Sequence, residues 1–251
     1  MVLYPLDAPA QADEAPVFVW DAIERQQRAG AREWRAVAQP DHAALSGDLA
    51  ACVVSGLPHA DDEVVRAIAL HDEGWAEFDS EVKAVDGRPL SFLDFTPKDF
   101  LIAWRGSIAR AEQSSPLGGV LVSEHFCRLG QLGMERYGDP QDVERIRQFL
   151  HEESQRQKLL RRTIPRSAEE IAGLVDLLQF CDLLSLYLCC GSKAAVEFPQ
   201  KADGRPIRLF RERELCRLEP AIFGAGMSLE VRARHYPARA DATSSIAFLL
   251  G

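Results

Sequence analysis

The segment spanning residues 168–191 constrains the fold more than any other part of the chain, because it is long, helix-patterned and almost wholly apolar. At the helical spacing of about 3.6 residues, one apolar stripe contains Ile171, Val175, Leu178 and Cys189, and Asp182 lies within it. An ionised carboxylate that is buried without a partner costs several kcal/mol, even after the protein has relaxed around it. The fold must therefore supply Asp182 with a metal ion, a cationic partner or a shifted pKa.

Three histidines occupy similar positions on the apolar faces of other predicted helices: His42, His71 and His125. Asp72 directly follows His71, and adjacent helical side chains point about 100° apart, so the pair can bind one centre only in a crook of the fold. Imidazole nitrogen and carboxylate oxygen together suit Fe, Mn, Zn or Co. A core histidine more often bonds to the backbone, and a buried aspartate more often caps a turn or pairs with arginine. Those explanations need a separate local solution for each residue, whereas one metal site accounts for His42, His71, Asp72 and Asp182 together.

Helical periodicity predicts six helices, at residues 40–55, 61–71, 99–111, 117–137, 140–162 and 168–191. Short alternating or β-branched stretches predict strands at residues 17–20, 34–37, 195–198, 207–210, 229–236 and 246–250. We therefore predict a mainly α fold, with a small β-rich part formed by the C-terminal segments and joined, in one alternative, by the N-terminal strands. We expect residues 1–15 to be a loose tail, 16–191 a helical domain and 192–251 a β-rich extension packed on it.

Composition narrows the function. With 47% hydrophobic and 27% charged residues, the 251-residue chain is typical of a soluble globular protein. No segment approaches the roughly 18 to 20 apolar residues that span a bilayer, and residues 1–15 lack the pattern of a signal peptide. A net charge of −9 argues against general nucleic-acid binding, although a few local cations could still hold a nucleotide substrate.

The cysteines and the absence of common catalytic motifs narrow the possible functions further. None of the six cysteines forms a Cys-x-x-Cys pair, so we expect small buried hydrophobic residues in a reducing cytosol rather than disulfides or a zinc ribbon. The chain has no Gly-x-Ser-x-Gly nucleophile elbow and no Gly-x-Gly-x-x-Gly after a strand. Gly118-Gly119 lacks the Lys-Ser/Thr of a phosphate-binding loop.

The order His42, His71-Asp72, Asp182, all on predicted helices, resembles the H…HD…D signature of the HD-domain superfamily of metal-dependent phosphohydrolases. The phrases QPDHAALSG (39–47), HDEGW (71–75) and DLLSL (182–186) look like a bacterial branch of HD-like proteins known only as a domain of unknown function. The resemblance covers residues 35–190 and extends towards the β-rich tail. It implies an HD-domain-like helical bundle.

The resemblance also implies that His42, His71, Asp72 and Asp182 bind a divalent transition metal, namely Fe, Mn, Co or Zn, with Mg as an alternative. Dinuclear members of the superfamily have additional histidines between the HD pair and the last aspartate. That interval here contains only His125 and His151, and His151 lies among charged residues typical of a solvated helix face. We therefore expect one ion rather than two. His125 is a candidate additional ligand, and alternatively it could orient water or contact phosphate.

The predicted reaction is hydrolysis of a phosphate ester of a small molecule or nucleotide by metal-activated water. Asp72 is the candidate base, and His125 or Glu73 could transfer the leaving-group proton. Glu73 could equally be a surface acid at a helix end. Phosphate requires cations nearby, and the candidates are Lys83, Arg88, Arg105, Arg161, Arg162 and Lys193.

Two alternatives remain open. The first is a non-catalytic regulatory module that binds a metal or an organic ligand, for which aromatic residues could wall a pocket: Trp75, Phe78, Phe92, Phe95 and Trp104. Such residues are more often core or loop anchors. The second is an HD-fold diiron oxygenase resembling myo-inositol oxygenase, which needs a fuller histidine set. The expected partner is a phosphorylated small molecule in the cytoplasm, with no general nucleic-acid or membrane binding, and a homodimer is left open.

Overall fold

The computed structural model describes residues 1–8, 15–136, 138–213, 215–238 and 243–251. The chain is 51% helical and 23% strand, and its eight-stranded sheet curls into a half-barrel. The prediction of a mainly α, HD-domain-like bundle with a small β-rich part is therefore wrong: the fold is mixed α/β. The physical reason is that strands from both ends of the chain pair with one another and form a complete layer.

The sheet interleaves N-terminal and C-terminal strands. Its order is β1 (Val2–Pro5), β3 (Trp34–Val37), β9 (Met227–Tyr236), β10 (Thr243–Leu250), β8 (Leu215–Glu219), β7 (Arg205–Glu212), β6 (Val196–Ala202) and β2 (Val17–Phe18). Neighbouring strands are antiparallel except for the parallel pairs β10–β8 and β6–β2. A separate small hairpin joins β4 (Ala84–Val85) to β5 (Arg88–Pro89).

The first strand corrects the expectation of a loose tail over residues 1–15. Val2 and Leu3 are fully buried, and β1 pairs along its whole length with β3. The Gln27 side chain also exchanges two hydrogen bonds of 2.9 Å with the backbone of Leu3. Residues 9–14 of the expected tail lie outside the described residues.

All six predicted helices are present, with ends displaced by a few residues: α2 (Gln39–Ala51), α3 (Asp62–Ala69), α4 (Pro97–Ser114), α5 (Pro116–Arg136), α6 (Pro140–Leu160) and α7 (Ala168–Cys190). The predicted strand at residues 17–20 is wrong beyond Phe18, because α1 (Val19–Gln27) begins there. Its buried residues Val19, Ala22, Ile23 and Gln27 have helical spacing. Three short 3₁₀ helices complete the fold: η1 (Glu73–Trp75), η2 (Phe92–Asp94) and η3 (Arg161–Thr163).

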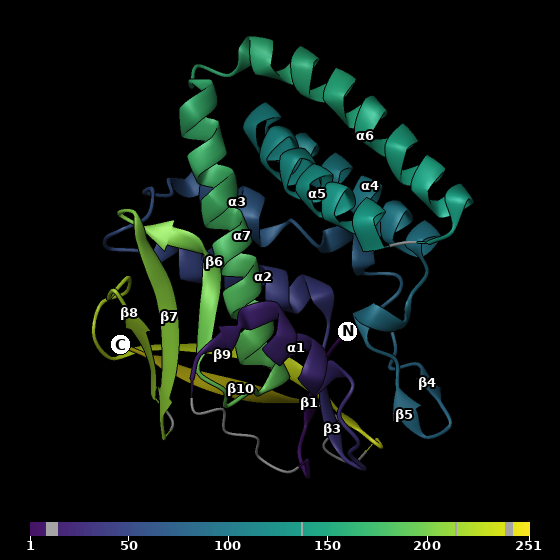
Figure 1. Ribbon diagram of the computed structural model, residues 1–251, viewed down its shortest axis with the longest axis vertical. Coiled ribbons are helices and arrows are strands. Elements are labelled where there is room, and N and C mark those ends of the chain that lie inside the picture. Colours follow the sequence, from purple (N-terminus) through teal and green to yellow (C-terminus); the bar gives the residue numbers. More distant parts are fainter. Residues whose placement is uncertain (9–14, 137, 214, 239–242) are drawn as a thin grey trace.

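Helix α7 is the central element. It runs from the end of the molecule where α4, α5 and α6 gather to the sheet at the other end (Figure 1). Ser167 and Glu170 form a capping box at its start, and Gly191 ends it in the left-handed conformation, with φ of 69°. By length and composition α7 could cross a membrane, contrary to the expectation that no segment would approach this length. Because 72% of that apolar window is buried within the protein, we interpret α7 as a core helix.

Two close backbone approaches position the segment that carries His71 and Asp72. A Cβ atom on Gly47 of α2 would lie 2.7 Å from the Cβ of Ala69, so this glycine lets α2 approach the end of α3. A Cβ on Gly74 would lie 1.9 Å from the carbonyl oxygen of Ala103 in α4, which leaves no room for a side chain. The Gly74 amide donates to Ser107 Oγ at 2.9 Å. The turn between α3 and η1 is thus held between α2 and α4.

Candidate metal centre

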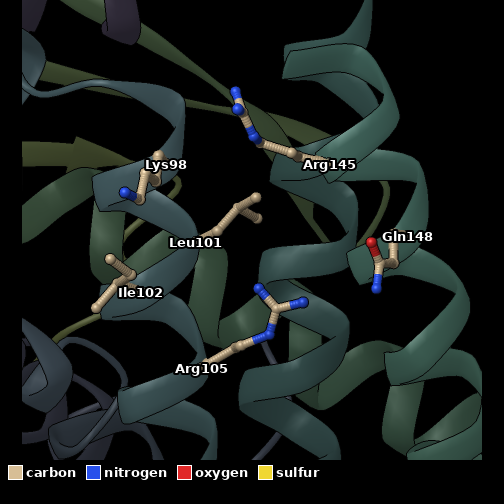
Figure 2. Close-up of a pocket in the computed structure, with 6 residues that line it drawn as sticks. All are labelled: Lys98, Leu101, Ile102, Arg105, Arg145 and Gln148. Carbon is tan, nitrogen blue, oxygen red and sulfur yellow. The ribbon is translucent and has the colours of Figure 1, made fainter. Parts of the chain in front are cut away.

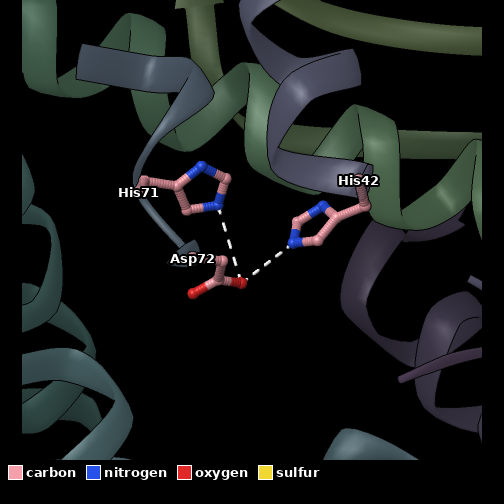
Figure 3. A group of neighbouring side chains, drawn as sticks. All are labelled: His42, His71 and Asp72. Carbon is pink, nitrogen blue, oxygen red and sulfur yellow. Dashed lines mark hydrogen bonds and ion pairs between the residues drawn. The ribbon is translucent and has the colours of Figure 1, made fainter. Parts of the chain in front are cut away.

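His42, His71 and Asp72 meet in the interior of the helical layer (Figure 3). Asp72 Oδ2 lies 2.9 Å from His42 Nε2 and 3.8 Å from His71 Nε2. Helix α3 ends at Ala69, so His71 and Asp72 belong to the turn before η1 rather than to a regular helix. This turn is the bend that allows two adjacent side chains to face one centre.

Helices α5 and α7 close the other side of the centre. His71 Nε2 lies 3.4 Å from Asp182 Oδ1, and His125 Nε2 lies 3.8 Å from Asp182 Oδ2. The three imidazole rings follow one another edge to face, with centroids 5.1 Å apart for His42 and His71 and 5.5 Å apart for His71 and His125. The structure therefore brings together His42, His71, Asp72, His125 and Asp182, the five residues predicted as ligands, which we call the centre.

The tautomer of neutral His71 follows from its backbone contact. His71 Nδ1 lies 2.8 Å from the carbonyl oxygen of Ile68, which can only accept, so Nδ1 carries the proton. The only lone pair of the neutral ring is then on Nε2, which is buried and has no hydrogen-bond partner among the described residues. Two groups of three potential ligands share His71, namely His42/His71/Asp72 and His71/His125/Asp182. Because one lone pair binds one ion, the two groups cannot each bind a metal through His71.

The electrostatics of the centre favour a cation between the carboxylates. Burial alone would lower the pKa of His71, but Asp72 and Asp182 raise it to about 9. Burial would raise the pKa of Asp182, yet His71 brings it down to about 2. Burial lowers the pKa of His125 to about 4, so this ring is neutral. Without a metal, the proton on His71 is the cationic partner that Asp182 requires.

Within each group of three potential ligands, the contacts are close to those expected around a metal ion. Ligand atoms about 2.1 Å from one ion lie about 3.0 Å apart in octahedral geometry and about 3.4 Å apart in tetrahedral geometry. The four contacts of the centre are 2.9, 3.4, 3.8 and 3.8 Å long. Two imidazole nitrogens and two carboxylate oxygens are a donor set for first-row divalent ions. The side chains of Asp72 and Asp182 are 9% and 11% exposed, so the centre is nearly closed to solvent.

Other predicted residues lie apart from the centre. Glu73 begins η1 and is partly exposed. Within the described part of the chain, no side-chain hydrogen bond or ion pair joins Glu73 to a residue of the centre. His151 is exposed on α6, as expected. The aromatic residues that could wall a pocket pack against other rings, in the contacts Trp20–Phe92, Trp75–Phe78, Trp75–Phe95, Phe78–Phe95, Phe100–Trp104 and Trp104–Phe126, of which the last is stacked. They act as anchors of the loop after the centre.

Most of the candidate phosphate-binding cations are neutralised by acidic partners or lie at the surface. Arg88 pairs with Asp94 at 2.9 Å, and Arg161 pairs with Glu124. The exposed cations are Lys83, Arg162 and Lys193. Arg105 lines a cavity of about 150 Å³ between α4 and α6 (Figure 2).

That cavity contains none of the five residues of the centre. Its other lining residues include Lys98, Arg145 and Gln148. Its two arginines are already paired, Arg105 with Glu152 at 2.6 Å and Arg145 with Asp142 at 2.7 Å. We therefore do not place a phosphate site there.

Three residues near the centre were not predicted. Ser46 and Ser185 lie behind His42, and Arg128 lies one turn after His125 on α5 and influences its pKa. Arg128 donates to Asp176 at 2.5 Å and to Gln179 at 2.8 Å. Helical spacing could have found Arg128 and Ser185, because each lies three residues after a predicted site residue.

The fold and this centre together define a mixed α/β protein with a buried His/Asp cluster between its helices. The profile of the family described as "Protein of unknown function (DUF3891)" matches residues 25–237, and the chain belongs to this family. No curated protein and no solved structure matches the chain. The expectation of a family of unknown function is confirmed, and the relationship to HD-domain proteins stays a prediction.

Proposed function

We propose that the protein is a metal-dependent hydrolase of the HD type, which cleaves a phosphate ester of a small molecule or nucleotide. The observation that carries the proposal is a pair of buried groups of three potential ligands, His42/His71/Asp72 and His71/His125/Asp182, which share His71. Within each group of three ligands, the ligand atoms lie within 4.8 Å of one another. The HD-like order of these residues supports the reaction class.

A single divalent ion held by the four residues of the HD-like signature would lower the pKa of a water molecule and polarise a phosphoryl oxygen. Asp72 contacts both histidines through Oδ2, so its other oxygen, which points away from them in Figure 3, is free to accept a proton from the attacking water. The small exposed fractions of Asp72 and Asp182 admit only a small group such as a terminal phosphate. The rest of the substrate would then lie outside the centre.

His125 and Arg128 would bind the phosphate. His125 Nδ1 is buried and has no hydrogen-bond partner among the described residues, so it can bond to an incoming phosphoryl oxygen. Arg128 lies one turn after His125, and although it pairs with Asp176, its remaining N–H groups could contact the ester. Because the His125 ring is neutral, it acts as a hydrogen-bond donor to the phosphate, and the leaving-group proton comes from water rather than from Glu73, which lies outside the centre.

The test combines metal analysis with a substrate screen. Purified protein is assayed for bound metal before and after addition of Mn, Fe or Co, and then against phosphomonoesters, phosphodiesters and nucleotides. We expect about one ion per chain, turnover of at least one ester class, and loss of that turnover in Asp72→Ala. His151→Ala, which removes an exposed histidine on α6, is the matched control and should retain both properties.

Two outcomes would overturn the proposal. A wild-type protein that binds none of the added ions would refute the metal site itself. A protein that binds an ion stoichiometrically but hydrolyses no ester in the screen would refute the hydrolase and favour the regulatory module.

A further inference from the structure

The second nitrogen of His42 faces a pair of buried serines. His42 Nδ1 lies 2.8 Å from Ser185 Oγ, and Ser185 Oγ lies 2.8 Å from Ser46 Oγ. Ser185 Oγ also donates to the carbonyl oxygen of Asp182 at 2.8 Å, and Ser46 Oγ donates to the carbonyl oxygen of His42 at 3.0 Å. His42, Ser46 and Ser185 are all fully buried, so water cannot complete this network.

The proposed metal site decides which nitrogen of His42 is protonated. A neutral imidazole that binds an ion through Nε2 carries its only proton on Nδ1. Ser185 Oγ lies 2.8 Å from Nδ1 and can accept this proton, while its own hydroxyl donates to the carbonyl oxygen of Asp182. In the metal-bound state His42 Nδ1 is therefore the donor and Ser185 Oγ the acceptor.

The consequence lies on the other side of the ring. With the proton on Nδ1, neutral His42 has its lone pair on Nε2, which faces Asp72 Oδ2 at 2.9 Å. In the metal-bound state Nε2 and Asp72 Oδ2 then both present lone pairs to the ion. We infer that Ser185, supported by Ser46, is a positioning residue that fixes the tautomer of His42 so that Nε2 is presented to the metal. This inference rests on the proposed metal site and extends it to residues that do not touch the ion.

The same device operates on His71 with a different acceptor. There the backbone carbonyl of Ile68 fixes the tautomer, and no substitution can remove that oxygen. Ser185 differs because its acceptor is a side chain and lies one turn after Asp182 on the same helix. It therefore ties the orientation of a ligand on α2 to the position of the ligand on α7. Removal of an outer partner of this kind commonly weakens metal binding about 10- to 100-fold.

The experiment compares serine variants in the full-length protein. Co²⁺ affinity is measured by competition with a chromophoric chelator, and the ring nitrogens of His42 are followed by ¹⁵N NMR in the Zn²⁺-loaded protein. We expect Ser185→Ala to weaken Co²⁺ binding about 10- to 100-fold and to speed the exchange of the Nδ1 proton. Ser185→Thr, which keeps the hydroxyl oxygen, should restore both. The control Ser123→Ala removes a buried serine that donates to Glu153 on α6, and it should leave both unchanged.

The outcomes separate this inference from the proposed function. Wild-type protein that binds neither ion would overturn the metal site. Wild-type protein that binds Co²⁺, with Ser185→Ala binding it equally tightly, would overturn only the role of Ser185. If Ser185→Ala does not fold, the wild-type spectrum still decides: protonated Nε2 on His42 in the Zn²⁺-loaded protein would refute the inferred tautomer.

Discussion

Among the described residues of the helical layer, two buried polar clusters differ in how completely their hydrogen bonds are satisfied. The first is the centre. The second, which we call the outer cluster, joins α5 to α6 through Ser123, Glu153, Arg156 and Gln157. Glu153 is 1% exposed, yet it accepts from Ser123 Oγ at 2.8 Å and pairs with Arg156 at 3.1 Å. Gln157 in turn donates to Ser123 at 2.8 Å.

In the centre, by contrast, His71 Nε2 and His125 Nδ1 are buried without a hydrogen-bond partner among the described residues. Native proteins satisfy nearly all buried polar atoms, so such exceptions call for an explanation. The outer cluster satisfies itself and therefore needs only to hold α6 in place. The centre keeps two buried nitrogens without such partners, as the proposed metal site would require. The comparison thus separates a self-satisfied cluster from one that the proposal makes functional.

The largest expected effect follows from removing Asp182. Asp182→Ala removes one carboxylate of the centre, and metal affinity should fall by more than about 100-fold, because loss of a direct ligand exceeds the loss of an outer partner. Metal content measured by elemental analysis after dialysis should drop to background. Asp142→Ala on α6 is the matched control, since it removes a carboxylate from an ion pair remote from the centre. Stoichiometric metal in Asp182→Ala would show that the centre is not the binding site.

Metal removal should have the next largest effect. An ion that binds only the folded state stabilises it by about 2.7 kcal/mol when the free ion is at 100 times its Kd. The free energy of unfolding in urea should fall by this amount when a chelator strips the ion from the wild type. Asp182→Ala should show no such difference. A chelator effect of equal size in both proteins would contradict the assignment.

Glu153→Ala tests the outer cluster. It leaves the buried Ser123 hydroxyl without its acceptor and Arg156 without one partner, so the protein should lose about 2 kcal/mol of stability. Co²⁺ affinity should be unchanged, because no hydrogen bond or ion pair among the described residues joins the outer cluster to the centre. Glu153→Gln, which keeps one acceptor oxygen, should lose less. A fall in Co²⁺ affinity that parallels the loss of stability would erase the distinction between the two clusters.

The centre could be predicted from sequence to a large extent, because helical periodicity is local. His42, His71, His125 and Asp182 each interrupt an apolar stripe, and one site accounts for them more simply than separate explanations do. Ser46 and Ser185 gave a weaker signal: the spacing of Ser185 from Asp182 could place it near the site, but a serine within an apolar helix shows no role until its neighbours are known. Their role depends on which face of α2 meets which turn of α7.

The sheet could not be predicted in the same way, because its pairings are non-local. Strand β3 pairs with β9, which lies roughly 200 residues further along the chain, and such distant partners leave no local pattern to detect. Strand β1 has only four residues, too few for a period of two to stand out. Helix α1 is different, because its buried positions do have helical spacing. The β-branched and aromatic residues Val17-Phe18-Val19-Trp20 at its start nevertheless favoured a strand.

Asp61 provides the smallest and most local test of the comparison. Its carboxylate caps α3 by accepting from the Val64 amide at 3.0 Å, at the end of the helix opposite His71. Asp61→Ala should cost about 1 kcal/mol of stability at neutral pH, whereas Asp61→Asn should keep most of the cap. The Val64 hydrogen bond, followed by Arg166, lowers the pKa of Asp61, so its contribution is present above the unfolded pKa of about 3.9 and is lost as pH falls through the lower folded value. Urea unfolding at neutral and acidic pH should therefore show the difference between wild type and Asp61→Ala shrinking in acid. Asp61 lies at the other end of α3 from the centre, so Co²⁺ affinity at neutral pH should be the same in both proteins. A weaker affinity in Asp61→Ala would mean that the centre depends on the whole of α3 rather than on the α3–η1 turn.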